Sequence, residues 1–325
     1  MNKPQVRHRQ LRGLRFRILY WPAAASTTAP TKTALLSHGT GLVAASWWLV
    51  APQLARAGYN VYAIDRRGHG GSDRAAADRA AAGRTEAGRT EAGHTAANHG
   101  GNGYEFLDFA EDILALVDAL ELQAIYGIGH SAGSTDLLLA AALRPGLFDQ
   151  LFVIDPTLSL PATEGATLPQ QALDTLARVQ QKRSRYPSAA AFRERALRKP
   201  PFALFAPAAF DAHLEQAFVH HRDGSVELCC HPDTEFLVML GIYRAMHDCY
   251  PGDQRGEPFH RLQNLDCVTT IASSGQSMPI YRRMVECGLQ LMPSAEHHHF
   301  AAQNHCVPME APDLTSEVLL QFARR

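Results

Sequence analysis

The sequence predicts an α/β protein in which helices cover a mostly parallel sheet and a helical insertion interrupts that sheet. Three observations carry this prediction. In the first half of the chain, short apolar runs alternate with stretches of helical periodicity. From about residue 157 to residue 262 the alternation stops, and helical stretches broken by prolines dominate. Strand and helix patterns then resume and continue to the end of the chain.

The elements before the insertion follow in a regular order. Leu14 to Tyr20 alternates apolar and basic residues, the period of a half-buried strand, although an arginine-rich targeting peptide is an alternative for this region. Further strands are expected at Thr33–Ser37, Asn60–Ile64, Ala124–Ile128 and Gln150–Ile154. Helices are expected through Trp47–Ala55, Phe106–Leu120 and Ala132–Leu143.

The later elements complete the predicted domain organisation. The insertion contains the helical stretches Gln170–Lys182 and Ala189–Arg198. After it we expect a strand at Cys267–Ala272, a helix at Pro279–Cys287, a strand at Leu289–Met292 and a helix at Pro312–Ala323. Residues 1–156 and 263–325 would then form the core, and residues 157–262 a helical cap over the ligand side of the sheet. Residues 74–103, which repeat AGRTE, hold few large apolar side chains and predict a flexible surface insertion.

Composition excludes several function classes. The 325 residues carry 31 Lys and Arg against 32 Asp and Glu, a net charge of −1, which disfavours general nucleic-acid binding. No apolar run is long enough for a membrane helix, and no secretory signal is evident. The 6 cysteines form no CxxC pair, so structural zinc is not expected. We therefore expect a cytoplasmic protein with free thiols, no cofactor or metal and a small-molecule substrate; the oligomeric state stays open.

The strongest chemical motif is Gly129-His130-Ser131-Ala132-Gly133. An apolar strand precedes it and a helical run follows it, which is the context that a nucleophile elbow requires. Its glycines permit a tight turn that lifts the Ser131 hydroxyl from the sheet edge and places it at a helix N-terminus. The motif therefore predicts that Ser131 is a nucleophile.

Two further motifs can complete this chemistry. His38-Gly39-Thr40-Gly41 is a glycine-rich turn after a strand, and it can direct a backbone N–H toward a substrate oxygen beside the N–H of Ala132. His305 lies between the last expected strand and the last helix, where a loop can bring a general base to Ser131. The adjacent histidines at 297–299 are competitors for that role and, less favourably, for a metal site.

The order HGTG, DRRGHGGSD, GHSAG and HCVPMEAP before a terminal helix resembles the α/β-hydrolase superfamily, in its branch of capped esterases, C–C hydrolases and haloalkane dehalogenases. The resemblance covers about residues 12–158 and 266–325. It implies the α/β-hydrolase fold, with Ser131 as nucleophile, His305 as base, and Thr40 and Ala132 as the oxyanion donors. Dehalogenases and epoxide hydrolases of this superfamily carry an aspartate nucleophile, so the serine argues against both chemistries.

The acid that should orient the base departs from the common pattern. The loop after the strand Cys267–Ala272 usually carries it, and here that loop has no carboxylate. Some members place the acid after the strand that follows the elbow helix, and Asp155 occupies that position. The alternative is that Asp155 only ends its strand. Asp253 and Glu296 are weaker candidates, Asp266 is expected at the wrong end of the sheet, and Glu310 resembles the superfamily's structural acid.

These residues predict a serine hydrolase that cleaves a small, largely apolar carboxylic ester through an acyl-enzyme. Four phenylalanines in the insertion favour an apolar substrate: Phe202, Phe205, Phe210 and Phe218. Two alternatives stay open. One is hydrolysis of a carbon–carbon bond in a diketone-like substrate by the same residues. The other is a catalytically silent protein that binds a small hydrophobic ligand.

Overall fold

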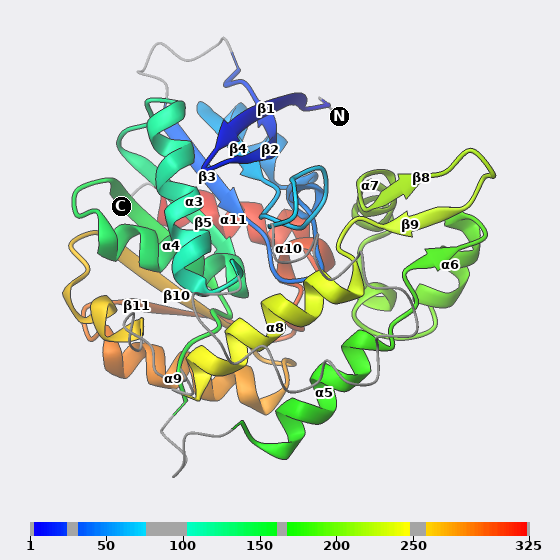
Figure 1. Cartoon of the computed structure of the whole chain (residues 1–325). Coiled ribbons are helices and arrows are strands. Elements are labelled where there is room, and N and C mark those ends of the chain that lie inside the picture. Colours follow the sequence, from blue (N-terminus) through cyan, green and yellow to red (C-terminus); the bar gives the residue numbers. More distant parts are fainter. Residues whose placement is uncertain (1–2, 25–31, 76–102, 161–167, 248–257, 324–325) are drawn as a thin grey trace.

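A central sheet organises the molecule (Figure 1). The computed structural model describes residues 3–24, 32–75, 103–160, 168–247 and 258–323. Within these ranges eight strands lie side by side in the order β1-β2-β4-β3-β5-β6-β10-β11. Their bounds are β1 Gln5–Leu11, β2 Leu14–Trp21, β3 Lys32–Ser37, β4 Tyr59–Ile64, β5 Ile125–His130, β6 Phe148–Ile154, β10 Val268–Ser274 and β11 Glu296–Phe300. The predicted flexible insertion at 74–103 lies almost wholly outside the described residues.

All neighbouring strands from β4 across the sheet to β11 pair in parallel, whereas β2 pairs antiparallel with both β1 and β4. β5 is buried along its whole length, as expected of a parallel strand covered on both faces. β3 lies between β4 and β5, and its Ser37 pairs in register with Gly129. The loops after β3 and β5 therefore leave the sheet side by side, at the edge where α/β proteins bind ligands.

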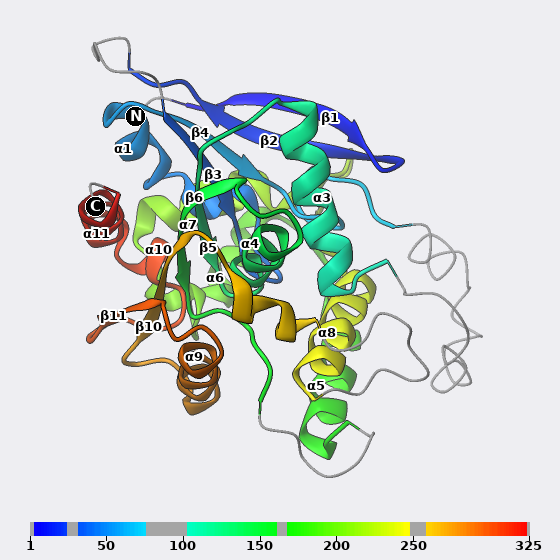
Figure 2. The same ribbon diagram turned by 90° about the vertical axis from the view of Figure 1, so that its left-hand side faces the viewer.

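Helices cover both faces of the sheet (Figure 2). The core on one face lies under α3 (Phe106–Ala119), α4 (Ala132–Leu143) and α9 (Pro279–Leu291). The opposite core lies under η1 (Ala44–Trp47), α1 (Ala51–Arg56) and α11 (Pro312–Phe322). Two short helices complete the core elements, η4 (Phe259–Asn264) and α10 (Val307–Glu310). The helix expected through Trp47–Ala55 is thus split, because η1 ends at Trp47 and α1 begins at Ala51, with Pro52 in its first turn.

The segment between β6 and β10 lies on one side of the sheet (Figure 1). Its described elements are α5 (Gln170–Gln180), β7 (Arg185–Tyr186), α6 (Ala189–Ala196), η3 (Phe202–Leu204), α7 (Pro207–Gln216), β8 (Phe218–His220), β9 (Val226–Leu228) and α8 (Pro232–Met246). The helical pattern predicted here is present. The sequence did not reveal the antiparallel sheet β7-β9-β8, whose strands have only two or three residues each. Such short strands leave no readable alternation.

One predicted strand is wrong. Leu289–Met292 is not a strand, because α9 continues through Leu291. Leu289 and Met292 extend the apolar face of that helix onto the core, and Pro293 follows its end. The last strand is β11, formed by the histidine-rich run that the sequence analysis assigned to a loop. Of the three histidines in this edge strand, His298 packs against Phe152 and Phe322, and Phe300 at the end of the strand is buried in the core.

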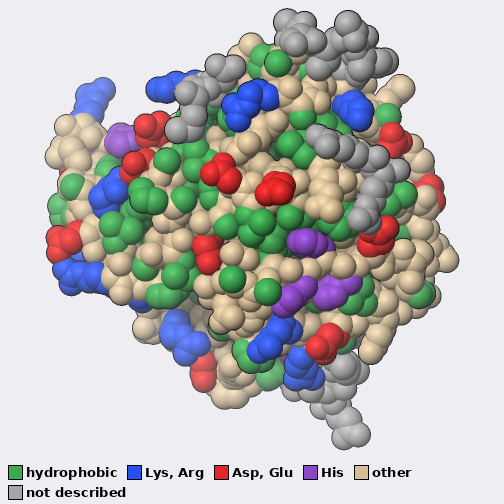
Figure 3. All heavy atoms as spheres, turned by 180° about the vertical axis from the view of Figure 1, so that it is seen from behind, with side chains coloured by type: hydrophobic (Ala, Val, Ile, Leu, Met, Phe, Trp, Pro, Cys, Tyr) green, Lys and Arg blue, Asp and Glu red, His purple; other side chains and the backbone are tan. Residues whose placement is uncertain are grey.

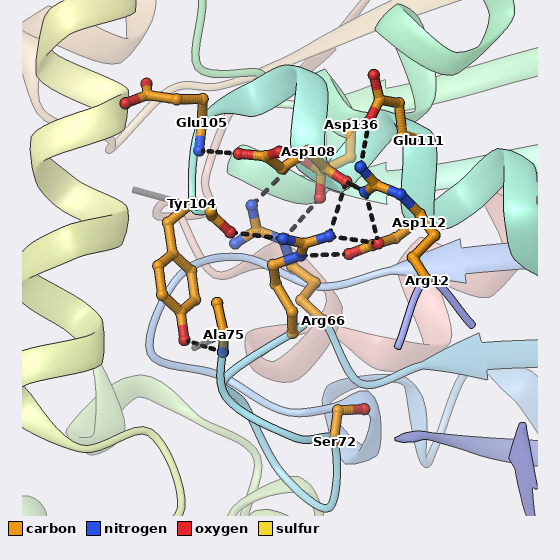
Figure 4. Close-up of polar contacts among 12 residues, drawn as sticks. Arg12, Arg66, Ser72, Ala75, Tyr104, Glu105, Asp108, Glu111, Asp112 and Asp136 are labelled. Carbon is orange, nitrogen blue, oxygen red and sulfur yellow. Dashed lines mark hydrogen bonds and ion pairs between the residues drawn. The ribbon is translucent and has the colours of Figure 1, made fainter. Parts of the chain in front are cut away.

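Buried ion pairs join the loop after β4 to α3 and α4 (Figure 4). Arg67 donates two hydrogen bonds of 2.6 Å to the carboxylate of Asp112, which also accepts one from Arg12. Arg66 forms a similar pair with Asp136 on α4. The side chains of both pairs are at most 6% exposed. This network fixes the loop that supplies the backbone contacts of the site described next.

Candidate active site

The GxSxG motif forms a strained turn between β5 and α4. Ser131 has φ 54° and ψ −127°, outside the usual regions for a residue with a side chain. Its N–H donates to the carbonyl O of Ile154 at 2.8 Å, which anchors the turn to β6. A Cβ on Gly133 would lie 2.5 Å from the carbonyl O of His38, so only glycine permits this approach of backbone to backbone. The turn predicted from the sequence is therefore present.

The HGTG loop lies directly against Ser131. A Cβ built on Gly39 would come within 3.0 Å of the Cβ of Ser131. Thr40 follows Gly39 and lines the same cavity as Ser131, and Ala132 follows Ser131 directly; no hydrogen bond from either backbone N–H is found within the described residues. Ala132 is also the first residue of α4, where an N–H has no acceptor inside the helix. Both residues that the sequence analysis names as oxyanion donors therefore adjoin Ser131 or the loop packed against it, and their role stays a prediction.

Two buried histidines hold the HGTG loop. The Nδ1–H of His38 donates to the carbonyl O of Gly39, and its Nε2 accepts from the N–H of Arg66. Nε2 of His69 accepts from the N–H of Gly41 at 3.2 Å. Burial lowers the pKa of both rings well below the ordinary value. The rings are therefore neutral, and each keeps one nitrogen free to accept a backbone proton.

Ser131, His305 and Asp155 form a continuous chain of hydrogen bonds. The Ser131 hydroxyl lies 3.0 Å from Nε2 of His305, and Nδ1 of the same ring lies 3.0 Å from Oδ2 of Asp155. Because an ionised carboxylate only accepts, Nδ1 carries a proton and Nε2 is free to accept from Ser131. The three residues come from the ends of β5 and β6 and from the loop before α10. This arrangement suits proton transfer away from the serine.

Asp155 is fully buried, and its carboxylate accepts hydrogen bonds from two serines as well as from His305. The last residue of β10 contributes the N–H of Ser274 at 3.0 Å, and the following loop, which carries no acid, contributes the hydroxyl of Ser277 at 2.7 Å. Burial alone would raise the pKa of Asp155, but the hydrogen bonds and charge of His305, followed by these two serines, outweigh it and hold the pKa below the ordinary value. Asp155 is therefore ionised and fixed beside the imidazole.

The other carboxylates considered from the sequence lie elsewhere. Asp266 accepts from the N–H of Gly146 at 2.7 Å, at the opposite end of β10. Glu310 accepts from the N–H of Asn304 at 2.9 Å and so fixes the loop that carries His305. Glu296 begins β11. Asp253 lies outside the described residues.

Two aromatic rings surround His305, and sequence reasoning did not find either contact. The phenol ring of Tyr281 stacks on the imidazole, with centroids 3.7 Å apart and planes 17° apart. His130 lies 4.8 Å away, and its Nε2 donates to the carbonyl O of His305 at 2.7 Å. Burial, then the charge of His305, lowers the pKa of His130 to about 3, so it stays neutral. No sequence signal distinguishes Tyr281 from any other residue of an amphipathic helix.

The competing histidines do not reach Ser131. The rings of His297 and His299, both on β11, each have a nitrogen 2.8 Å from the hydroxyl of Ser273 on β10. Within the described residues, no group of three or more His, Cys, Asp or Glu side chains is placed to hold a metal ion.

A cavity of about 510 Å³ opens at Ser131. Most of its wall is apolar, and it lies between α8, α9, η3 and the loops of the site; the apolar lining includes Leu204, Met239, Ile242, Tyr243, Met246, Ile280, Tyr281 and Met284. The four phenylalanines of the insertion that favoured an apolar substrate are not among the residues that line this cavity. They pack instead on one another and on Phe192 in the core of the segment between β6 and β10.

Comparison with known proteins agrees with this geometry. A family model described as alpha/beta hydrolase fold matches residues 34–197, about half of the chain. The chain belongs to this family. The match spans the HGTG loop, the Ser131 turn and Asp155. It ends before His305, which only the three-dimensional structure connects to the other residues.

Individual hydrolases resemble the chain to different degrees. Epoxide hydrolase A of Mycobacterium tuberculosis is 28% identical over 169 residues, which are 52% of this chain and 42% of that protein. The chain thus matches less than half the length of this curated relative. The crystal structure of E-2-(acetamidomethylene)succinate hydrolase has a TM-score of 0.72 at 18% identity, covering 99% of this chain and 100% of that one. A thioesterase domain from the curacin biosynthetic pathway gives the same TM-score and identity, covering 98% and 100%. At this identity the two structures show the shared alpha/beta hydrolase fold alone.

Proposed function

We propose that this alpha/beta hydrolase is a serine hydrolase that cleaves a small, largely apolar carboxylic ester through an acyl-enzyme. The observation that supports it most is the hydrogen-bond chain from Ser131 through His305 to Asp155. In this proposal the chain is a catalytic triad, and the segment at 157–262 is a cap over the cavity. The apolar cavity wall favours an apolar acyl or alcohol part.

The geometry supports a two-step mechanism. Ser131 Oγ attacks the ester carbonyl carbon while Nε2 of His305 takes the hydroxyl proton, and the N–H groups of Thr40 and Ala132 hold the oxyanion. Collapse breaks the carbon–oxygen bond, and His305 returns the proton to the departing alcohol. Water then attacks the acyl carbon and loses a proton to His305; as the acyl carbon–Oγ bond breaks, His305 returns that proton to Ser131 Oγ and the acid is released. Asp155 stabilises the imidazolium in both steps.

Epoxide hydrolysis is the activity that the Mycobacterium tuberculosis relative suggests. The superfamily resemblance ties that chemistry to an aspartate nucleophile, and residue 131 is a serine. The elbow therefore favours acyl transfer. Carbon–carbon bond hydrolysis would use the same three residues, so the choice of substrates must separate it from ester hydrolysis.

A fluorophosphonate probe tests the proposal directly. We expect it to label the purified protein at Ser131, and the Ser131→Ala variant to remain unlabelled and inactive. p-Nitrophenyl esters and vinylogous diketones then distinguish the two hydrolytic reactions. A folded protein that neither reacts with the probe nor hydrolyses either substrate class would instead be a ligand-binding member of the fold.

A further inference from the structure

One face of α8 forms a wall of the cavity. The residues that line the cavity from this helix are Glu235, Met239, Ile242, Tyr243 and Met246, which recur at helical spacing. Four of them present largely apolar side chains. Glu235, near the N-terminal end of α8, is the one carboxylate in the lining among the described residues. An acid in such a wall is costly to bury unless a donor satisfies it.

The two oxygens of Glu235 have different surroundings. Oε2 accepts a hydrogen bond from Nζ of Lys182 at 2.6 Å, and Lys182 does not line the cavity. Oε1 lies 3.7 Å from the position that a Cβ on Gly41 would take, beside the HGTG loop. Within the described residues no hydrogen bond reaches Oε1. One oxygen is thus held from outside the cavity, and the other is open to its contents.

The side chain of Glu235 is 15% exposed and lines the cavity, so water inside the cavity can solvate its free oxygen. A ligand that fills the cavity displaces water from Oε1. If that ligand has no donor, a largely buried carboxylate oxygen loses its hydrogen-bond partner, which costs more than the net gain of an ordinary hydrogen bond. A site built to hydrogen-bond a substrate group therefore rejects the analogue that lacks it.

The ion pair with Lys182 favours a neutral hydrogen-bond donor over a cation at Oε1 of Glu235. Burial opposes its charge, but the Glu235 carboxylate outweighs burial and raises the pKa of Lys182, so the ammonium is retained. The pair is close to neutral as a whole, so it attracts a second cation weakly. A neutral hydroxyl or amide N–H can bind to Oε1 without competing for this ion pair.

We propose that Oε1 of Glu235 accepts a hydrogen bond from a neutral hydroxyl or amide N–H of the substrate. The preferred substrate is then an ester that is apolar next to the scissile bond and bears such a donor on the part that lies along α8. This inference rests on the proposed hydrolase function, since it names the substrate class of the same cavity.

Matched esters test the inference. p-Nitrophenyl ω-hydroxyalkanoates of increasing length are compared with methyl-terminated esters of the same number of heavy atoms. We expect one length at which the hydroxy ester has a kcat/KM higher than its isostere by ~10- to 100-fold. Glu235→Leu should abolish or invert this preference. Glu235→Gln should retain part of it, because the amide oxygen still accepts.

Controls separate the possible failures. Glu286 is exposed on α9, and Glu286→Leu should leave the preference unchanged. Each variant is first shown to react with the fluorophosphonate probe at Ser131 and to keep its Tm within a few degrees. Absence of probe reaction in the unmodified protein would overturn the proposed function itself. Two results with normal probe reaction would overturn only the role of Glu235. One is a ratio of kcat/KM between hydroxy ester and isostere that is the same for the unmodified protein and Glu235→Leu at every length. The other is a preference for ω-ammonium esters.

Discussion

The ring of Tyr281 lies flat on the imidazole of His305, with centroids 3.7 Å apart. An aromatic face attracts a cation more than it attracts a neutral ring, and in the proposed mechanism the imidazole becomes a cation as Ser131 attacks. We therefore expect the stack to stabilise the charged transition state of that mechanism more than the resting state. It also limits rotation of the ring, which must keep hydrogen bonds on both sides.

Replacing Tyr281 should therefore change kcat more than KM. We expect Tyr281→Leu to lower kcat by ~2- to 30-fold, the range of a cation–π contact, and Tyr281→Phe to retain most of the activity. Progressive fluorination of a phenylalanine at this position tests the electrostatic part, since it weakens the ring's negative face with little change in shape. A rate that is independent of fluorination would reduce Tyr281 to a steric support.

The role of Asp155 can be separated from that of its surroundings. Asp155→Asn keeps the shape but removes the charge that stabilises the imidazolium and fixes its tautomer, and we expect kcat to fall by about 10^4-fold. Ser277→Ala removes only one donor to Asp155, so it should cause a far smaller loss. Stopped-flow measurement of acyl-enzyme formation compares the two. Near-normal turnover by Asp155→Asn would return the acid role to another carboxylate.

The sequence predicted the parts of the site that depend on local backbone geometry. The turn at Ser131 follows from glycines at fixed spacing between a strand and a helix, and the position of Asp155 follows from its place after β6. The serines that hold Asp155 were not predicted. Ser274 and Ser277 reach it only because β6 and β10 are neighbours in the sheet, and no local pattern encodes that pairing.

Packing explains the other differences. Leu289 and Met292 fit a short buried strand as well as the last turn of an amphipathic helix, and only the fit of α9 against the core decides between them. The histidines of β11 carry no apolar strand pattern, because this edge strand pairs with β10 alone and buries only Phe300 fully. Likewise, Phe202 and Phe205 are apolar enough for a pocket, but they fill the interior of their own segment instead.

Buried histidines make stability depend on pH. His38, His69, His130 and His213 are each at most 2% exposed, and burial is the largest cause that lowers the pKa of each, to about 3 for His130 and about 4 for His213. The unfolded chain binds protons at these positions below about pH 6.5, and the folded chain does not. The free energy of unfolding should therefore decrease as pH falls from about 6.5, by about 1.4 kcal/mol per pH unit for each histidine.

A variant at His213 tests one of these four titrations separately, because His213 does not line the cavity at Ser131. Among the residues that the structure describes, its Nδ1 has no hydrogen-bond partner, and its ring packs against Phe202 and Phe205. We expect His213→Phe to remove one proton from the slope between about pH 6.5 and pH 4. His8 is exposed, so His8→Phe is the matched control and should leave the slope unchanged. Urea titrations at several pH values measure both, and equal slopes for all three proteins would contradict the assignment.

Arg67 and Asp112 form a buried ion pair, so removing one partner should cost stability mainly because it leaves the other charge buried and unpaired. Asp112→Asn leaves a buried guanidinium without its charge partner, so we expect a loss of about 3–5 kcal/mol in the free energy of unfolding. Arg144 and Asp118 form a pair of the same chemistry whose side chains are 39% and 61% exposed, and Asp118→Asn should cost only about 0–1 kcal/mol. Replacing both buried partners, as Arg67→Met with Asp112→Leu, should recover much of the stability. That recovery would show that the ion pair itself contributes little to the net free energy of unfolding. A double variant no more stable than Asp112→Asn would instead show that the pair is net stabilising.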